Sequence, residues 1–387
     1  IKFHGSYQQD NRDARKERDR KPGGKAFIFM VRCKIPGGKV TAAQYLEVDR
    51  LAEAYGNGTL RITSRQGFQL HGVLKSNLKQ TIRSINDSLL TTLGACGDVS
   101  RNVMAPPAPV ASPVYHELQR QADVLAAHFA PRSGAYHEVW LNGKQLPVPV
   151  PETNEEPIYG KVYLPRKFKI SFALPEDNST DLYAQDLGFL ADVENGQIVG
   201  YNVHAGGGMG MTHGNANTFP FIAQAICYVR ADQVVPAGEA VIKLFRDHGN
   251  RADRKRARLK YVLHDWGVDK FREVLQSYLP FPLILPKDIP VTGFPLHLGW
   301  HEQGDGKFYY GISIENGRIK DEGDLRLRTA IRKLVESLQP TIRLTPMQDI
   351  LLCDLNADAK PLINRLLTIY GVTKPERISL LQQHSMA

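Results

Sequence analysis

The sequence predicts an α+β protein in which two related halves pack as one pseudo-symmetric body. Strand-like and helix-like periodicities alternate over residues 26–90 in the order β-α-β-β-α. In addition, segment 59–70 aligns without gaps on segment 341–352, with five identical residues. The separation of 282 residues is too long for a solenoid period. The repeat therefore indicates two copies of one unit.

Length and composition exclude several classes of protein. The chain has 387 residues, which suggests two or three domains, and its hydrophobic content of 42% argues against global disorder. The longest apolar runs, such as Ala26–Val31, are far shorter than the roughly 20 residues of a membrane helix. No secretory signal is visible. We therefore expect a protein without a membrane anchor.

The first 90 residues contain the best-defined elements. Residues 1–25 are polar and predict a solvated arm, with a charge run from Asp10 to Lys21. A strand is expected next, because apolar residues alternate from Phe27 to Cys33. Pro and Gly residues end it, and Thr41 with Gln44 forms a capping-box pattern that begins a helix. The rest of the unit is predicted as two strands and a helix: Leu60–Thr63, Gly67–Leu74 and a helix containing Leu78, Ile82, Ile85 and Leu89.

The middle of the chain predicts a second body of mixed structure. Helices are expected near residues 115–130, 237–248 and 268–279, and a proline-rich connection at 147–157. Apolar residues alternate with other residues over Lys167–Leu174, which predicts a strand. Gly206–Gly210 predicts a tight turn that could also bring backbone close to a ligand.

Positive charge on strands is the main chemical signal. In a strand over 65–73, Arg65, Gly67, Gln69 and His71 share one face, opposite Phe68 and Leu70. The second repeat has Met347 and Leu351 in place of Arg65 and Gln69. The simpler interpretation is a solvent-facing strand with a structural histidine. The more specific one is a site for an anionic ligand.

A second strand repeats this pattern. Lys167 and Lys169 project to the same side, about 7 Å apart, and repel each other unless an anion or water lies between them. The alternative is an exposed edge strand whose lysines oppose aggregation. Arg101, which we place in a loop, is uninformative alone.

The basic run Arg246–Lys260 carries seven Lys and Arg against two Asp. It predicts either a solvated helix face or a surface for phosphate or polycarboxylate ligands. The four cysteines are too far apart in sequence for a Cys-x-x-Cys motif, so we expect reduced structural thiols and no metal ligand among them.

Three motifs resemble the sulfite reductase haemoprotein family, and the ferredoxin-dependent branch most closely. They are Leu60–Gly72, Thr92–Val103 and Leu164–Lys169. The resemblance implies an α+β nitrite/sulfite reductase fold with pseudo-twofold ferredoxin-like repeats. It also implies sirohaem, a [4Fe–4S] cluster, sulfite as the substrate, ferredoxin as the electron donor and a monomeric enzyme. The reaction would be six-electron reduction of sulfite to sulfide in sulfur assimilation. The compartment that the resemblance implies is the bacterial cytoplasm or the plastid stroma.

The resemblance also implies roles for individual residues. Arg32, Arg101, Lys167 and Lys169 would surround the substrate. Sirohaem would be held or flanked by Arg61, Arg65, Gln69, His71, Gly206, Gly207, Gly208 and Arg258. The expected domains are the arm 1–25, a repeat domain of 26–93 with 298–373, a sirohaem and substrate domain 94–297, and the start of a cluster domain at 374–387.

One departure from the family concerns the cluster. The family's two Cys motifs are missing, and no cysteine present matches a ligand position, so we expect an inactive fragment without the cluster domain. The sister enzyme, nitrite reductase, is the nearest alternative, and Lys169 favours sulfite over it because the sister motif usually carries Asn there. A basic nucleic-acid-binding protein is a further alternative, which no RRM, KH or helix-turn-helix signature supports.

Overall fold

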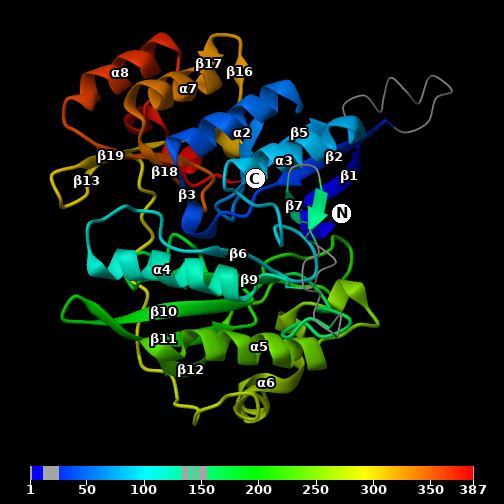
Figure 1. Ribbon diagram of the computed structural model, residues 1–387. Coiled ribbons are helices and arrows are strands. Elements are labelled where there is room, and N and C mark those ends of the chain that lie inside the picture. The colour runs from blue at the N-terminus through cyan, green and yellow to red at the C-terminus, as the bar shows by residue number, and fades with distance from the viewer. Residues whose placement is uncertain (1, 12–25, 133–138, 142–143, 147–154, 387) are drawn as a thin grey trace. The chain divides into compact units, whose positions relative to one another are not determined.

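The structure is a computed structural model that describes residues 2–11, 26–132, 139–141, 144–146 and 155–386 (Figure 1). The chain forms two compact units. Unit 1 comprises Ile1–Ala95, Pro107–Ser112 and Leu296–Ala387, and unit 2 comprises Cys96–Pro106 and Pro113–Pro295. Of the helices in the described part of the chain, none combines the length and apolar character that crossing a membrane requires.

Unit 1 contains two five-stranded sheets. In order across the first sheet, the strands are β1 (Ser6–Asp10), β2 (Phe27–Arg32), β5 (Phe68–Val73), β4 (Leu60–Ile62) and β15 (Arg318–Ile319). The second sheet has β13 (Gly299–Glu302), β14 (Phe308–Ile312), β19 (Ile350–Leu355), β18 (Thr341–Leu344) and β3 (Lys39–Val40). Each sheet therefore takes one edge strand from the other sequence repeat.

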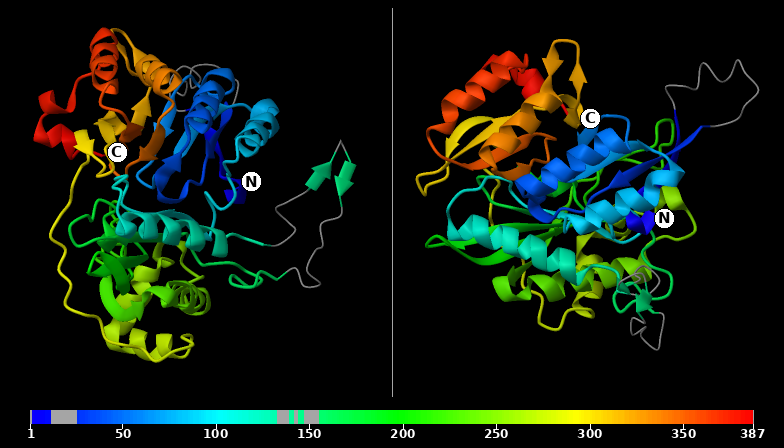
Figure 2. Two further views of the ribbon diagram at one scale, coloured as in Figure 1. Left: turned by 60° about the vertical axis from the view of Figure 1, so that its left-hand side comes forward. Right: turned by 45° about the horizontal axis from the view of Figure 1, so that its top comes forward.

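Four helices form one layer in unit 1 (Figures 1 and 2). Their order across the layer is α8 (Ala359–Ile369), α7 (Leu327–Leu338), α2 (Ala42–Ala54) and α3 (Leu78–Asp87). The Thr41 hydroxyl accepts a hydrogen bond from the Gln44 amide at 3.2 Å, which confirms the capping box that begins α2. Residues from both repeats, such as Tyr45 and Ile331, belong to a single buried hydrophobic core.

The strand exchange is held by matched contacts between the repeats. The side-chain amide of buried Gln66 donates to the carbonyl of Leu344 at 3.0 Å, and Gln348 donates to the carbonyl of Ile62 at 3.0 Å. Just before β15, a Cβ on Gly317 would lie 2.3 Å from the Ile62 carbonyl oxygen. Only glycine therefore allows the second repeat to lay β15 against β4.

Unit 2 is a mixed five-stranded sheet with helices packed on it. The strand order is β12 (Gln224–Arg230), β11 (Gln197–Ala205), β10 (Leu187–Glu194), β9 (Phe168–Ala173) and β6 (Ser100–Met104). Strands β6, β9 and β10 run parallel, and β11 and β12 are antiparallel to their neighbours. Helix α4 (Pro113–His128) contacts β6, β9 and β11, and α5 (Val234–His248) and α6 (Leu259–Gln276) contact β12. A hairpin pairs β7 (Val139–Leu141) with β8 (Lys144–Leu146).

Several local predictions need correction. Residues 6–10 are not a solvated arm, because they form β1 and pair with β2. Most of the charge run Asp10–Lys21 lies outside the described residues. Most of the proline-rich connection 147–157 is also outside them. The helix expected at 268–279 begins at Leu259 and is interrupted at Gly267, where φ is 76°. Arg101 lies on β6, not in a loop, and β9 is an internal strand, so the edge-strand interpretation of its lysines is wrong.

We expect Gly317→Ala to destabilise the protein more than Gly323→Ala does. Both glycines have a positive φ, of 65° and 56°, but a Cβ at Gly323 meets nothing within 4 Å. The control should therefore lower the free energy of unfolding by the left-handed strain alone, about 1–2 kcal/mol. Gly317→Ala adds a clash with backbone and should cost about 3 kcal/mol or more. Urea unfolding measures both, and equal losses would contradict the proposed role of the Gly317 contact.

Candidate functional site

Four neighbouring strands of unit 1 bring three arginines and a glutamine to the same level. Arg32 on β2 lies opposite Gln69 on β5, and Gln69 lies opposite Arg61 on β4. Arg61 in turn lies opposite Arg318 on β15. Residues paired across strands project from the same face of a sheet. We call Arg32, Gln69, Arg61 and Arg318 the arginine row.

Gln69 connects the row to His71. Its amide oxygen accepts from the Arg32 Nε at 2.9 Å, and its amide nitrogen lies 3.0 Å from the His71 Nε2. The pKa of His71 is lowered to about 4, mainly by burial and also by the positive charges of Arg61, Arg32 and Arg318. His71 is therefore neutral at pH 7, and its Nε2 accepts the hydrogen bond that Gln69 donates.

Arg65 does not share the strand face on which the sequence pattern placed it. Strand β5 begins at Phe68, and Arg65 lies in the turn that precedes it, half-buried. The same turn contains Gln66, whose φ is 50° and whose side-chain amide donates to the Leu344 carbonyl of the other repeat. The role of Arg65 toward a cofactor stays a prediction.

A second cationic cluster lies in unit 2, around the start of β9. Lys167 directly precedes β9 and is half-buried, and buried Arg101 lies on the parallel neighbour β6. The pKa of Lys167 is lowered to about 8, mainly by burial. The charges of Arg258, Arg101 and Arg166 act in the same direction, against the smaller opposite effect of Asp186. The field at Lys167 is thus dominated by positive charge.

Asp186 organises the other residues of this cluster. It is fully buried and accepts two hydrogen bonds of 2.9 Å from the Arg258 guanidinium. It also accepts from the Lys169 backbone amide at 2.9 Å. The charge of Arg258 is therefore compensated inside unit 2, which the sequence did not indicate. The Lys169 side chain instead acts on Asp181. Burial raises the pKa of Asp181, and the positive charge of Lys169 partly offsets this increase.

The glycine-rich turn packs tightly against its own unit. The amides of Gly206, Gly207 and Gly208 donate to the carbonyls of Asp186, Gln185 and Phe221. A Cβ on Gly207 would lie 2.2 Å from the Tyr183 carbonyl oxygen. Internal packing is thus one physical reason for these glycines, and a close approach to a cofactor stays a prediction.

Lys260, which the sequence analysis missed, holds the same turn. It is buried, and its Nζ donates to the carbonyls of Gly208 at 3.0 Å, Gly210 at 2.8 Å and Phe219. Burial lowers its pKa. In the sequence this residue is one of many cations in the basic run, and no pattern distinguishes it from the exposed ones.

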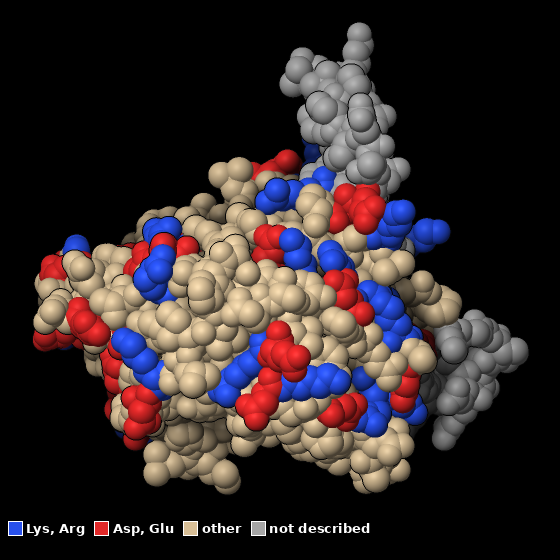
Figure 3. Space-filling model, turned by 90° about the horizontal axis from the view of Figure 1, so that it is seen from below, with Lys and Arg blue, Asp and Glu red and all other residues tan. Residues whose placement is uncertain are grey.

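The basic run Arg246–Lys260 does not form a uniform basic surface. Arg246 pairs with Asp247, Arg254 with Asp98, and Arg256 with Asp265. On the face seen from below, Lys and Arg are interspersed with Asp and Glu (Figure 3). A nucleic-acid site needs cations left available for phosphates, so these ion pairs argue against that alternative.

The four cysteines do not fit a [4Fe–4S] cluster, which needs several converging thiolates. All four are buried, and burial raises the pKa of Cys33 and of Cys227 to about 12. Among the described residues, no three His, Cys, Asp or Glu side chains are grouped so that they could hold a metal ion.

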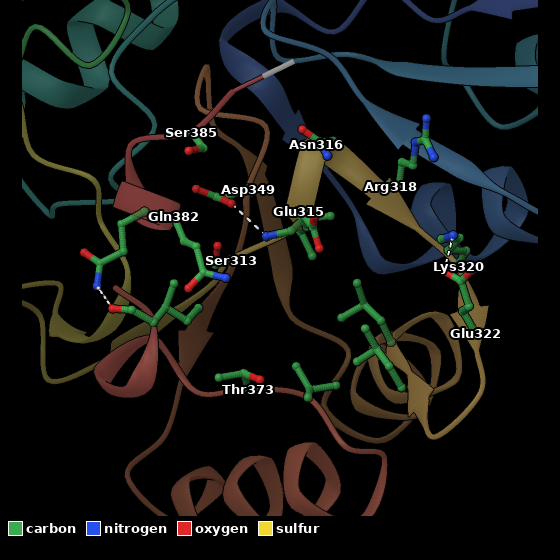
Figure 4. Close-up of a pocket in the computed structure, with 16 residues that line it drawn as sticks. Ser313, Glu315, Asn316, Arg318, Lys320, Glu322, Asp349, Thr373, Gln382 and Ser385 are labelled. Atoms are coloured by element: carbon green, nitrogen blue, oxygen red, sulfur yellow. Dashed lines mark hydrogen bonds and ion pairs between the residues drawn. The ribbon is translucent and has the colours of Figure 1, made fainter. Parts of the chain in front are cut away.

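A cavity of about 410 Å³ in unit 1 lies beside the second repeat (Figure 4). Asp349 lines it. Burial raises the pKa of this carboxyl to about 7, although the hydrogen bond from the Ile314 amide acts in the opposite direction. The cavity has both acidic and basic residues in its wall, including Glu315 and Lys320. It therefore lacks the predominance of positive charge found in the arginine row.

Comparisons with known proteins agree with the motifs. Residues 120–283 match the nitrite and sulphite reductase 4Fe-4S domain, although this segment contains one cysteine, Cys227. Residues 20–88 and 301–368 match the nitrite/sulfite reductase ferredoxin-like half domain. The two half-domain matches coincide with the two repeats found in the sequence.

Individual relatives cover the whole chain. A sulfite reductase [NADPH] haemoprotein β-component from Staphylococcus saprophyticus is 44% identical over 387 residues, all of this chain and 68% of the relative. A sulfite reductase [ferredoxin] from Synechococcus elongatus is 43% identical over 404 residues, with 100% of this chain and 64% of the relative covered. The chain thus spans about two thirds of their length.

A solved structure supports the same assignment. The Mycobacterium tuberculosis NirA protein is similar with a TM-score of 0.75 and 25% identity, over 96% of this chain and 62% of that one. The predicted α+β fold with ferredoxin-like half domains is confirmed. On sequence and fold together, the chain belongs to the nitrite and sulfite reductase family.

Proposed function

We propose that this chain binds sirohaem and sulfite as part of a sulfite reductase that reduces sulfite to sulfide with six electrons. The observation that carries the proposal is the concentration of positive charge on rigid strands. The charges that act on His71 are all positive, and those on Lys167 are mostly so. Relatives of this chain bear the name sulfite reductase.

Sirohaem suits the donor set of unit 1. It is a macrocycle rimmed with carboxylates, and burying them without compensation would be prohibitively costly. Guanidinium groups bind carboxylates through paired hydrogen bonds. Arg61 and Arg65 would hold carboxylates, and Gln69 and His71 would flank the ring. When bound, sirohaem supplies the iron that takes the substrate's sulfur atom and passes electrons to it.

Arg32, Arg101, Lys167 and Lys169 would act on the oxyanion. Arginines keep their charge at every physiological pH, so Arg32 and Arg101 would stabilise the negative oxygens. A pKa of about 8 allows the Lys167 Nζ to give up a proton near neutral pH, as oxygens leave as water. Lys169, beside Asp181, would supply a second proton.

Ferredoxin is the electron donor that we propose. The chain has a formal net charge of +9, which favours an acidic partner that is steered electrostatically. One relative at 43% identity is named as ferredoxin-dependent. Other relatives are named as NADPH-type, so a flavoprotein donor is the second candidate. The affinity of the chain for each donor, measured at increasing salt, would separate the two.

The function is tested first by ligand binding. The chain, loaded with sirohaem, should bind sulfite more tightly than nitrite, and Lys169→Asn should weaken sulfite binding about tenfold while changing nitrite binding less. The reason is the loss of one cation suited to a doubly charged oxyanion. Absorbance titration measures both affinities.

Lys161→Asn is the matched control, because the Lys161 side chain is 81% exposed in the same unit. It should leave both affinities unchanged. If the ratio of the two affinities is unchanged in Lys169→Asn, the role proposed for Lys169 is refuted. If the wild-type chain does not bind sirohaem, the proposed function itself is overturned.

Anion binding should also weaken as pH rises through about 8. Lys167 is positively charged below its pKa of about 8 and neutral above it, so attraction for an anion is complete at low pH and lost at high pH. A bound anion favours the charged form and moves this transition upward. Sulfate is a suitable probe because its own charge does not change in this range. Lys167→Met should remove the pH dependence, and a transition retained in that variant would assign it to another group.

A further inference from the structure

We propose that Arg318 of the second repeat binds a carboxylate of the anionic ligand held by the arginine row. The inference rests on the proposed function, because it names a further residue for the same sirohaem. Arg318 carries no recognisable motif, and it lies 257 residues beyond Arg61 in the sequence (318 − 61).

Register places Arg318 at the end of the row. It is paired with Arg61 across β15 and β4, so both guanidinium groups leave the same face of the sheet. Neighbouring strands are about 4.8 Å apart, so the row of four strands extends over about 14 Å. The charge of Arg318 also contributes to lowering the pKa of His71, two residues beyond Gln69 on β5.

Two like charges directly opposite each other destabilise a sheet. Arg318 forms no ion pair among the described residues, whereas nearby Lys320 pairs with Glu322. In Figure 4 the Arg318 side chain points away from Asp349, although the residue also lines that cavity. An anion bound at Arg318 would give this exposed cation a favourable contact at the end of the row.

The backbone around Arg318 is fixed firmly enough to position a ligand contact. Gly317 lies against the Ile62 carbonyl so closely that no Cβ fits, and the Gln348 amide donates to the same carbonyl. These contacts hold β15 against β4. A rigid strand loses little entropy when one of its side chains orders around a ligand.

The second sheet supplies an internal comparison. There Lys39 on β3 is paired with Arg343 on β18, as Arg318 is with Arg61. The next positions in that row are Leu351 and Gly311, which offer no polar side chain. Lys39 and Arg318 are thus equivalent exposed edge residues, but only Arg318 extends a polar row.

The experiment is a titration of the full chain with sirohaem, followed by absorbance and by quenching of tryptophan fluorescence. Arg318→Gln should weaken binding about tenfold, as expected for one charge-assisted hydrogen bond. Lys39→Gln should bind like wild type, and Arg318→Lys should recover part of the loss. Thermal unfolding of Arg318→Gln without ligand should occur at an unchanged or slightly higher temperature, because the residue is exposed and the change removes a like charge opposite Arg61.

The outcomes separate this inference from the proposed function. If the wild-type chain binds sirohaem and Arg318→Gln binds equally well, the role of Arg318 is refuted and the function stands. Equal weakening by Lys39→Gln would indicate a general charge effect and would also refute it. If the wild-type chain does not bind sirohaem, both the function and the inference fail.

Discussion

The reciprocal hydrogen bonds that Gln66 and Gln348 make across the two repeats are the constraint on which unit 1 depends. Each side chain leaves its own repeat and donates to a strand carbonyl of the other, at 3.0 Å in both directions. Both residues adopt a positive φ, of 50° and 71°, to do so. A buried carbonyl without a partner is costly, so each repeat completes the hydrogen bonding of the other. Neither repeat could keep this arrangement alone.

The same exchange explains how two similar halves acquire different chemistry. In the first sheet, cross-strand pairing aligns Arg32, Gln69 and Arg61 with an arginine from the second repeat. At the equivalent positions of the second sheet, Leu351 and Gly311 offer no polar group. One fold thus supports a polar face in one half and a largely apolar one in the other, because the backbone pairing does not depend on the side chains.

The helices and the first sheet of unit 1 differ in the balance of their charges. Buried Asp49 on α2 accepts from Arg328 and Arg332 on α7, both at 2.6 Å, so these charges compensate one another where the repeats meet. In the arginine row, Gln69 is neutral, and the fields that reach His71 are all positive. This predominance of positive charge at His71 is the physical basis of the anion site that we propose for the sheet.

The sequence by itself determined the repeat, the α+β class, the family and most of the cationic residues, because periodicity and motif identity are local properties. It placed Arg65 on a strand and Arg101 in a loop, and both were wrong, since the positive φ of Gln66 and the parallel pairing of β6 with β9 are set by distant segments. Only the tertiary structure decided that Asp186 neutralises Arg258 and that Lys260 holds the glycine turn. It alone also brought Arg318 beside Arg61, because hydrogen bonding between strands joins residues that no sequence spacing relates.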